Sequence, residues 1–335
     1  MSPEPPPKAP QLSSFDSRTP LPGDRVTIIG RRKLVMNDAT QEIHAVIGGT
    51  GFVGRYLADA LRNTGKARVR LLARKHPDSL PPETEFYPID AVSGMGMKEG
   101  LSRANVVWYL PGILAETREQ SYEMVHHQGV VNTLSAVDQR SLRRIVHISA
   151  VGTAPNAPSG YHRTKARGEE ALRNSLLPYT IVRPSLVFGK GDRSINQFLD
   201  IARLVHILPM IGPGTARVQP IFAGDLARLC VMIAERAETL GKIYEAGGPR
   251  IYTYRQMMET LKNSCHLKSP ILGAPVAIMM ASAVLQKLLL PRPFLTPDVL
   301  RMALSDNVPD KNACVADFGM TLLALEAWLE GSDRQ

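Results

Sequence analysis

The sequence predicts an α/β fold in which a doubly wound parallel sheet carries helices on both faces. Short β-branched runs alternate with longer helical segments from about residue 42 to residue 188. One of these runs ends in a glycine turn that opens an apolar-periodic helix. With 335 residues and 44% hydrophobic content, the chain is large enough for such a domain and a smaller C-terminal lobe.

Residues 1–41 differ in composition from the rest of the chain. They show little apolar periodicity and contain many prolines, so we expect a flexible N-terminal extension. The segment lacks the apolar core of a signal peptide, and Glu4, Asp16 and Asp24 argue against a transit peptide. Met36, close before the first strand, is an alternative start of the chain.

The first predicted strand, residues 43–47, runs into a glycine turn and then a helix. Gly48 allows a sharp turn, Gly51 removes a Cβ where a pyrophosphate must approach, and Gly54 lets the helix approach the sheet. The free N–H groups of the helix then face the phosphates. This pattern predicts a Rossmann-type dinucleotide site, whose other expected contacts are Thr50, Phe52 and Val53.

The second predicted strand, residues 67–75, ends in Arg74 and Lys75, where an NAD site usually places a carboxylate. A guanidinium can hold a 2′-phosphate bidentately, so the sequence favours NADP(H) over NAD(H). The alternative is that Arg74 is a solvated loop residue. Asp90, after the third strand at 85–89, is placed to meet the adenine amino group, or else is a strand-end turn residue.

Further strands are predicted at residues 104–110, 144–149 and 179–184, with a helix over 121–138. Ligands of such sheets lie beyond the carboxyl ends of the strands. At that edge Ser149 closes a strand, and Tyr161 and Lys165 lie four residues apart on one face of the next helix.

These three side chains predict a catalytic site. A neighbouring ammonium and a positive nicotinamide ring would lower the pKa of Tyr161, which could then exchange a proton with a substrate oxygen. Ser149 would hold that oxygen, and Lys165 would also bind the nicotinamide ribose. The alternative is that Tyr161 and Lys165 are ordinary surface residues of an amphipathic helix.

Charge and cysteine usage limit the other functions. The net charge of +9 comes from scattered residues without a dense basic block, which does not suggest nucleic-acid binding but suits an anionic cofactor or membrane surface. Cys230, Cys265 and Cys314 lack metal-ligand spacing, and His126 and His127 have no visible metal partners. We therefore expect no metal site and a cytoplasmic protein with reduced thiols.

Residues 271–290 are strongly apolar, but their uninterrupted part, residues 276–285, is far short of a membrane span. We expect a helix buried against the C-terminal lobe. The alternative is an interfacial helix that dips into lipid.

Several motifs together resemble the extended or atypical short-chain dehydrogenase/reductases: the glycine turn 48–54, Ser149, Tyr161 with Lys165, and residues 183–189. Residues 188–198, 219–227 and 244–249 are similar to the subfamily that contains the NADPH-binding accessory subunit of respiratory complex I and a related protein of coenzyme Q synthesis. The resemblance covers residues 42–330. Two departures from the family pattern are Gly49-Thr50 in the turn and Ser194, where an aromatic residue is common.

The resemblance implies an epimerase/dehydratase-like NADP(H)-dependent oxidoreductase that acts on a carbonyl or hydroxyl substrate, quinone-related or otherwise hydrophobic. The cofactor domain would comprise residues 42–188 and 219–248, and the substrate lobe residues 189–218 and 249–330. The backbone from Pro184 to Val187 would approach the nicotinamide. The resemblance equally implies a non-catalytic accessory or assembly protein of a complex I or ubiquinone-synthesis complex, peripheral to the inner membrane.

Overall fold

The computed structural model describes residues 41–290, 293 and 295–331. The expected N-terminal extension, apart from Gln41, lies outside the described residues.

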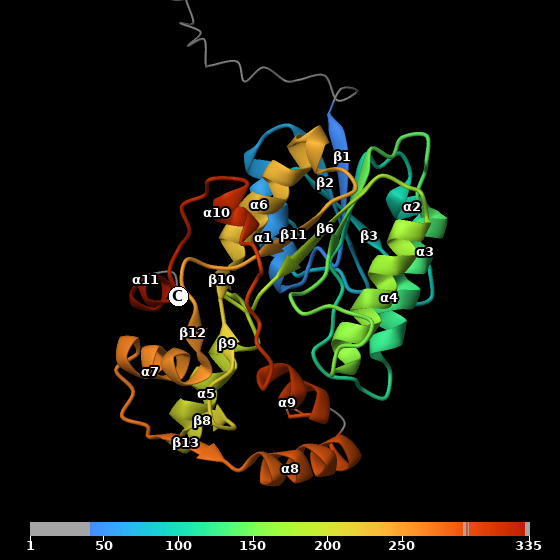
Figure 1. Ribbon diagram of the computed structural model, residues 1–335. Coiled ribbons are helices and arrows are strands. Elements are labelled where there is room, and N and C mark those ends of the chain that lie inside the picture. The colour runs from blue at the N-terminus through green and yellow to red at the C-terminus, as the bar shows by residue number, and fades with distance from the viewer. Residues whose placement is uncertain (1–40, 291–292, 294, 332–335) are drawn as a thin grey trace, which may run out of the picture. The chain divides into compact units, whose positions relative to one another are not determined.

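A seven-stranded parallel sheet forms the centre of the described chain (Figure 1). Its strands are β1 (Glu42–Ile47), β2 (Ala67–Ala73), β3 (Thr84–Pro88), β4 (Val106–Tyr109), β5 (Arg144–Ile148), β6 (Tyr179–Pro184) and β11 (Ile243–Ala246). They lie in the order β11-β6-β5-β4-β1-β2-β3, and every neighbouring pair is parallel. The predicted doubly wound Rossmann-type sheet is confirmed, and its chain order reverses between β1 and β4.

Helices cover both faces of this sheet (Figure 1). One face carries α1 (Phe52–Asn63), α6 (Ala223–Glu235) and α10 (Ala313–Ala316), with the short turn η2 (Ala237–Thr239) leading from α6 to β11. The other face carries α2 (Met97–Leu101), the π-helical turn η1 (Met124–Gln128), α3 (Gly129–Ala136) and α4 (Gly160–Asn174).

The strands are buried on both faces because their side chains alternate between two cores. In β1, Val46 contributes to the core under α1 and α6, whereas Ala45 and Ile47 contribute to the core under α2 and α4. All three side chains are fully buried. This explains why the strands appear in the sequence as short, nearly continuous apolar runs.

The C-terminal lobe has its own core, to which Phe188, Met257 and Trp328 contribute. It is joined to the sheet domain by the parallel pair β7 (Val187–Phe188) and β10 (Ile221–Phe222). Its other elements are α5 (Ile195–Val205), β8 (Leu208–Ile211), β9 (Arg217–Val218), β12 (Tyr252–Thr253), α7 (Tyr254–Ser264), β13 (Ile271–Ala274), α8 (Val276–Leu289), α9 (Pro297–Ala303) and α11 (Leu325–Glu330).

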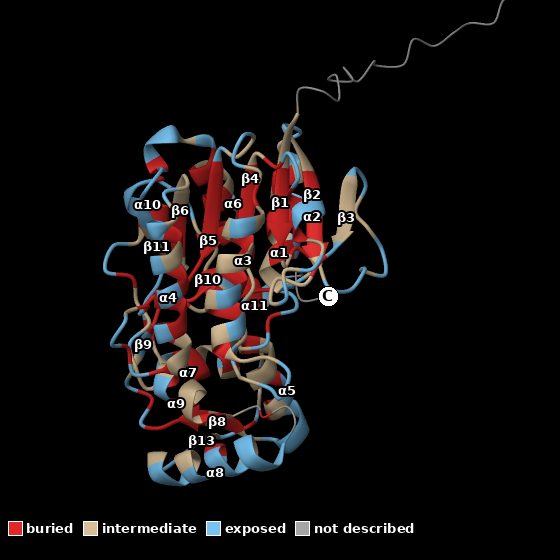
Figure 2. Ribbon diagram, turned by 90° about the vertical axis from the view of Figure 1, so that its right-hand side faces the viewer, coloured by how far each residue is buried: buried red, intermediate tan, exposed pale blue. Residues whose placement is uncertain are grey.

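The prediction that the apolar stretch 271–290 is a buried helix is wrong. The stretch forms β13 and α8, and Ala283 is the one buried residue of α8. Figure 2 shows α8 at the edge of the lobe, mostly in the colour of exposed residues. Hydrophobicity alone gave no information on whether the lobe would cover this helix. Within the described residues, no helix has both the length and the apolar character needed to cross a membrane.

Candidate functional site

The loops that follow β1 and β4 lie side by side at the point where the strand order reverses. Gly48 has a φ of +78°, and its N–H donates to Leu72 O at 2.8 Å. A Cβ on Gly48 would lie 3.6 Å from the ring of Pro111, which follows β4. In open α/β sheets, ligands bind in the crevice at this switch point.

The glycine turn holds α1 unusually close to the end of β1. A Cβ on Gly54 would lie 2.3 Å from Gly48 O and 2.7 Å from Gly49 Cα, so only glycine fits there. Gly51 N–H donates to Gly48 O at 2.9 Å and Gly51 is the N-cap of α1. Among the described residues, no side chain caps this helix. Its first N–H groups and dipole can therefore serve an anion, with Thr50, Phe52 and Val53 lining the same turn.

The residues proposed to distinguish the cofactors lie after β2 and β3. Arg74 and Lys75 directly follow β2 and are exposed, and the Arg74 guanidinium donates a long hydrogen bond of 3.5 Å to Gln120 Oε1. Asp90 follows β3, and its Oδ1 accepts from Val92 N at 3.0 Å. That bond matches the turn role that was the alternative for Asp90.

Lys165 links α4 by hydrogen bonds to the ends of β4 and β5. Its buried ammonium donates to Ile148 O, at the end of β5, at 3.0 Å and to Pro111 O at 3.4 Å. Burial lowers the pKa of Lys165 to about 8, although Glu169 opposes this shift. A buried cation held beside the switch point by two backbone carbonyls is a candidate ligand-binding group.

Ser149 follows β5 directly, so it lies one residue from a hydrogen-bond partner of Lys165. Its Oγ is buried, 3.2 Å from Thr153 Oγ1, and its N–H donates to Val182 O in β6 at 2.7 Å. The chain after β6 reaches the same edge, because Val151 N–H donates to Pro184 O at 3.0 Å. The predicted residues Ser149, Lys165 and Pro184 are therefore grouped at the carboxyl edge of β5 and β6, and Val187 follows in β7.

Tyr161 lies in the first turn of α4 and is surrounded by aromatic rings. Its ring centroid is 5.0 Å from that of His126, 5.1 Å from that of His162 and 5.9 Å from that of Tyr122, all in edge-to-face geometry. Burial raises the pKa of Tyr161 to about 12. Desolvation is the cause of this rise, and the Lys165 ammonium donates to backbone carbonyls. The prediction that this ammonium and a nicotinamide ring together lower the pKa of Tyr161 concerns the cofactor-bound protein and stays a prediction.

His126, which the sequence analysis considered only as a possible metal ligand, is a neighbour of the site. It is fully buried in η1, its Nε2 accepts from Ile113 N at 3.2 Å, and its Nδ1 lies 3.0 Å from Thr164 Oγ1. Burial, followed by the charge of Lys165, lowers its pKa well below the usual value. His126 therefore acts as a neutral hydrogen-bonding link between α4 and the loop after β4. A π-helical turn, which is often found at functional sites, is the structural signal that marks it.

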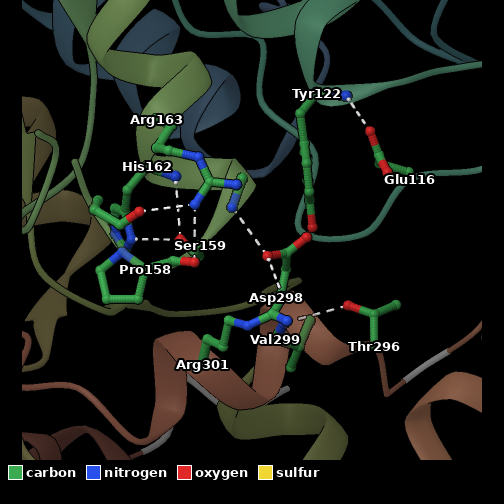
Figure 3. A network of polar contacts seen from close by, with 12 residues as sticks. Glu116, Tyr122, Pro158, Ser159, His162, Arg163, Thr296, Asp298, Val299 and Arg301 are labelled. Atoms are coloured by element: carbon green, nitrogen blue, oxygen red, sulfur yellow. Dashed lines mark hydrogen bonds and ion pairs between the residues drawn. The ribbon is translucent and has the colours of Figure 1, made fainter. Parts of the chain in front are cut away.

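Asp298 of α9 ties the C-terminal lobe to the helix that carries Tyr161 (Figure 3). Its Oδ1 accepts from Gly160 N, the first residue of α4, at 2.9 Å and from Arg301 at 3.2 Å. A carboxylate at a helix N-terminus is stabilised by the helix dipole. Nothing in the local sequence connects Asp298 with residue 160, so the contact was not predicted.

Solved structures share this fold. A nucleoside-diphosphate-sugar epimerase from Staphylococcus aureus superposes with a TM-score of 0.71 at 18% identity, covering 87% of this chain and 100% of that one. At that identity the likeness shows the fold alone.

Two curated relatives illustrate what the sequence is similar to. One is "NADH dehydrogenase [ubiquinone] 1 alpha subcomplex subunit 9, mitochondrial" from Arabidopsis thaliana, 33% identical over 65% of this chain. The matched segment spans only 57% of that relative's length. The other is "Ceramide reductase" from Caulobacter vibrioides, 27% identical over 69% of this chain and 73% of the relative.

Residues 44–247 match the model of the NAD dependent epimerase/dehydratase family, which covers the glycine turn, the seven-stranded sheet and the helix of Tyr161 and Lys165. The chain belongs to the NAD dependent epimerase/dehydratase family.

Proposed function

We propose that the protein is an NADP(H)-dependent oxidoreductase of the atypical short-chain type, which reduces the carbonyl group of an apolar substrate. The observation that carries the proposal is the position of Lys165. Its buried ammonium stands between the ends of β4 and β5, beside the glycine turn and one helical turn from Tyr161. A nicotinamide coenzyme supplies the hydride in such chemistry.

The preference for NADP(H) rests on Arg74. It directly follows β2, is exposed, and makes one long hydrogen bond to Gln120, so a phosphate could recruit its guanidinium at little cost to the fold. Guanidinium groups bind phosphate through short, charge-assisted hydrogen bonds. Lys75 adds a second positive charge next to it.

The proposed reduction needs a proton donor beside the substrate carbonyl. A phenol with a pKa of about 12 is protonated at neutral pH and can donate its proton to a carbonyl oxygen. Lys165 would stabilise the resulting phenolate, and Ser149 would hold the substrate oxygen. These roles require the substrate carbonyl to lie between the two hydroxyl groups.

The names of two relatives support an apolar substrate, because one refers to ceramide and the other to ubiquinone. We infer a lipid-like or quinone-like carbonyl compound. The proposed localisation is cytoplasmic and peripheral to the inner membrane.

A second candidate is a non-catalytic NADPH-binding accessory or assembly protein of a respiratory or quinone-synthesis complex. The observation that favours it is the packing of Tyr161 against three aromatic rings, together with the respiratory subunits among the relatives. In such a protein the coenzyme would stabilise the fold by mass action without turning over.

Two experiments test the proposal. Mass spectrometry of the ligand released from the purified protein identifies the coenzyme, and a panel of apolar carbonyl compounds and quinones is then tested for NADPH oxidation. Tyr161→Phe should leave NADPH affinity nearly unchanged and lower turnover more than about 100-fold. Tyr244→Phe, in the edge strand β11, is the matched control and should behave as the wild type.

Coenzyme that is retained but oxidised by no substrate would favour the accessory role. Unchanged turnover in Tyr161→Phe would remove Tyr161 from the chemistry.

A further inference from the structure

Helix α8 presents an apolar stripe to solvent. Ile278, Leu285 and Leu288 are spaced seven and three residues apart, so they lie on one face of the helix. They are 62%, 56% and 71% exposed. The neighbouring residues Val284, Leu289 and Leu290 are 43–68% exposed, and Leu272 of β13 is 51% exposed. Figure 2 shows this helix in the colour of exposed residues along the outer edge of the lobe.

The opposite face of α8 attaches the helix to the lobe. Met279, Met280 and Ala283 contact the small core formed by Ile211 and Leu300. Gln286 Oε1 accepts from Leu295 N at 3.3 Å. The exposed stripe therefore lies on the face of α8 that points away from the lobe, while the other face packs on it. An exposed apolar surface of this kind marks an interaction site.

Charge indicates the kind of partner. Residues 260–297 contain no Asp or Glu, and their Lys and Arg residues are Lys262, Lys268, Lys287 and Arg292. The whole chain carries a net charge of +9. Glu259 and Asp298 flank this segment, and Lys287 is ion-paired with Glu116 at 3.3 Å, so the charge argument depends mainly on Lys262 and Lys268. An apolar helix face with basic residues near it in the chain matches an anionic lipid surface, which attracts Lys and Arg and accepts the apolar side chains. A second copy of this chain would bring the same positive charges together.

We propose that α8 lies flat on an anionic membrane surface, with Ile278, Leu285 and Leu288 inserted among the lipids. Its 14 residues make a helix about 21 Å long, which can lie in the interface but not span the bilayer. This inference rests on the peripheral membrane location in the proposed function and names the surface that would make the contact; it requires neither coenzyme nor turnover, so its failure would leave the proposed reaction untouched.

The test is co-sedimentation of the full chain with vesicles. The wild type should bind vesicles that mix phosphatidylcholine with phosphatidylglycerol at least about tenfold more strongly than vesicles of phosphatidylcholine alone, and added salt should weaken this binding. Leu285→Ser/Leu288→Ser should weaken binding to the anionic vesicles by at least about tenfold.

The matched control is Leu176→Ser/Leu240→Ser, which changes two exposed leucines that lie just before the amino ends of β6 and β11. It should bind as the wild type does. Lys268→Glu should also weaken anionic binding about tenfold, whereas Lys98→Glu on α2 should not. Unchanged thermal unfolding of each variant shows that the fold is intact.

The proposal is overturned if the wild type does not bind anionic vesicles, or if the two leucine variants bind equally. It is also overturned if ultracentrifugation shows self-association that Leu285→Ser/Leu288→Ser abolishes while no variant binds lipid, since α8 would then join two copies of the chain.

Discussion

Replacing Lys165 with methionine should abolish a rise in folding stability at alkaline pH. Lys165 is 2% exposed, and burial lowers its pKa from the usual 10.5 to about 8. Methionine has a similar length and no charge. It leaves Ile148 O and Pro111 O without the hydrogen bonds that Lys165 donates.

Folding stability rises with pH because the folded protein loses the Lys165 proton at a lower pH than the unfolded chain does. Below pH 8 both states are protonated, so the folded protein carries the full cost of a buried cation. Between pH 8 and 10.5 the folded protein loses the proton while the unfolded chain keeps it, so stability rises with pH. The difference in pKa corresponds to about 3 kcal/mol. Above pH 10.5 both states are neutral and the gain is complete.

Near pH 7, loss of the two hydrogen bonds destabilises the variant by about 1 kcal/mol each, which offsets part of its gain from removing the charge. The free energy of unfolding of the variant at pH 7 therefore differs little from that of the wild type, so the test is how this free energy changes with pH. Urea unfolding of the wild type, Lys165→Met and the exposed-lysine control Lys98→Met from about pH 7 to 10.5 gives the three stability curves. Wild type and Lys98→Met should rise relative to Lys165→Met by about 3 kcal/mol.

Parallel curves for the wild type and Lys165→Met would refute this reasoning. They would mean that Lys165 has the same pKa in the folded and unfolded states, and that its ammonium is solvated in the folded protein rather than buried beside the candidate site.

Three further substitutions test the parts of the site around Lys165. Arg74→Ala should weaken NADPH binding about 10- to 100-fold and leave NADH binding unchanged in fluorescence titrations, and an equal loss for both coenzymes would argue against a 2′-phosphate contact. Asp298→Ala should lower the free energy of unfolding in urea by about 1–3 kcal/mol because Gly160 N–H loses its charged acceptor, whereas the exposed Asp200→Ala should cost much less. If the two variants are equally stable, the link between α9 and α4 is unimportant. Gly54→Ala places a Cβ 2.3 Å from Gly48 O, so NADPH affinity should fall at least about tenfold, and an unchanged dissociation constant would show that the turn can adjust.

Six strands of the sheet were predictable because each depends on residues that are close together in the sequence. A parallel strand buried on both faces leaves a short apolar run, and the glycine turn must follow the first strand directly. The edge strand β11 was not predicted as a strand. Three of its four residues, Ile243–Glu245, are exposed or half-buried, and the strand mixes apolar with polar types, so it leaves no clear pattern.

The surroundings of the candidate site were only partly predictable. Residues 149, 161 and 165 follow a fixed spacing after a strand, and that spacing can be read from the sequence. The ring of Tyr122, the neutral His126 and the carboxylate of Asp298 reach Tyr161 or its helix from other segments. Only the packing of those segments brings them together, and the same packing determines that desolvation raises the pKa of Tyr161.

The apolar helix and the candidate site are joined by short chains of contacts. Lys287 of α8 forms an ion pair with Glu116 at 3.3 Å, and Glu116 accepts from Tyr122 N at 3.1 Å. The ring of Tyr122 lies against that of Tyr161. On the other side, α9 follows α8 in the chain and supplies Asp298 to the N-terminus of α4. The contacts of α8 and of the segment that follows it therefore extend by two routes to the residues around Tyr161.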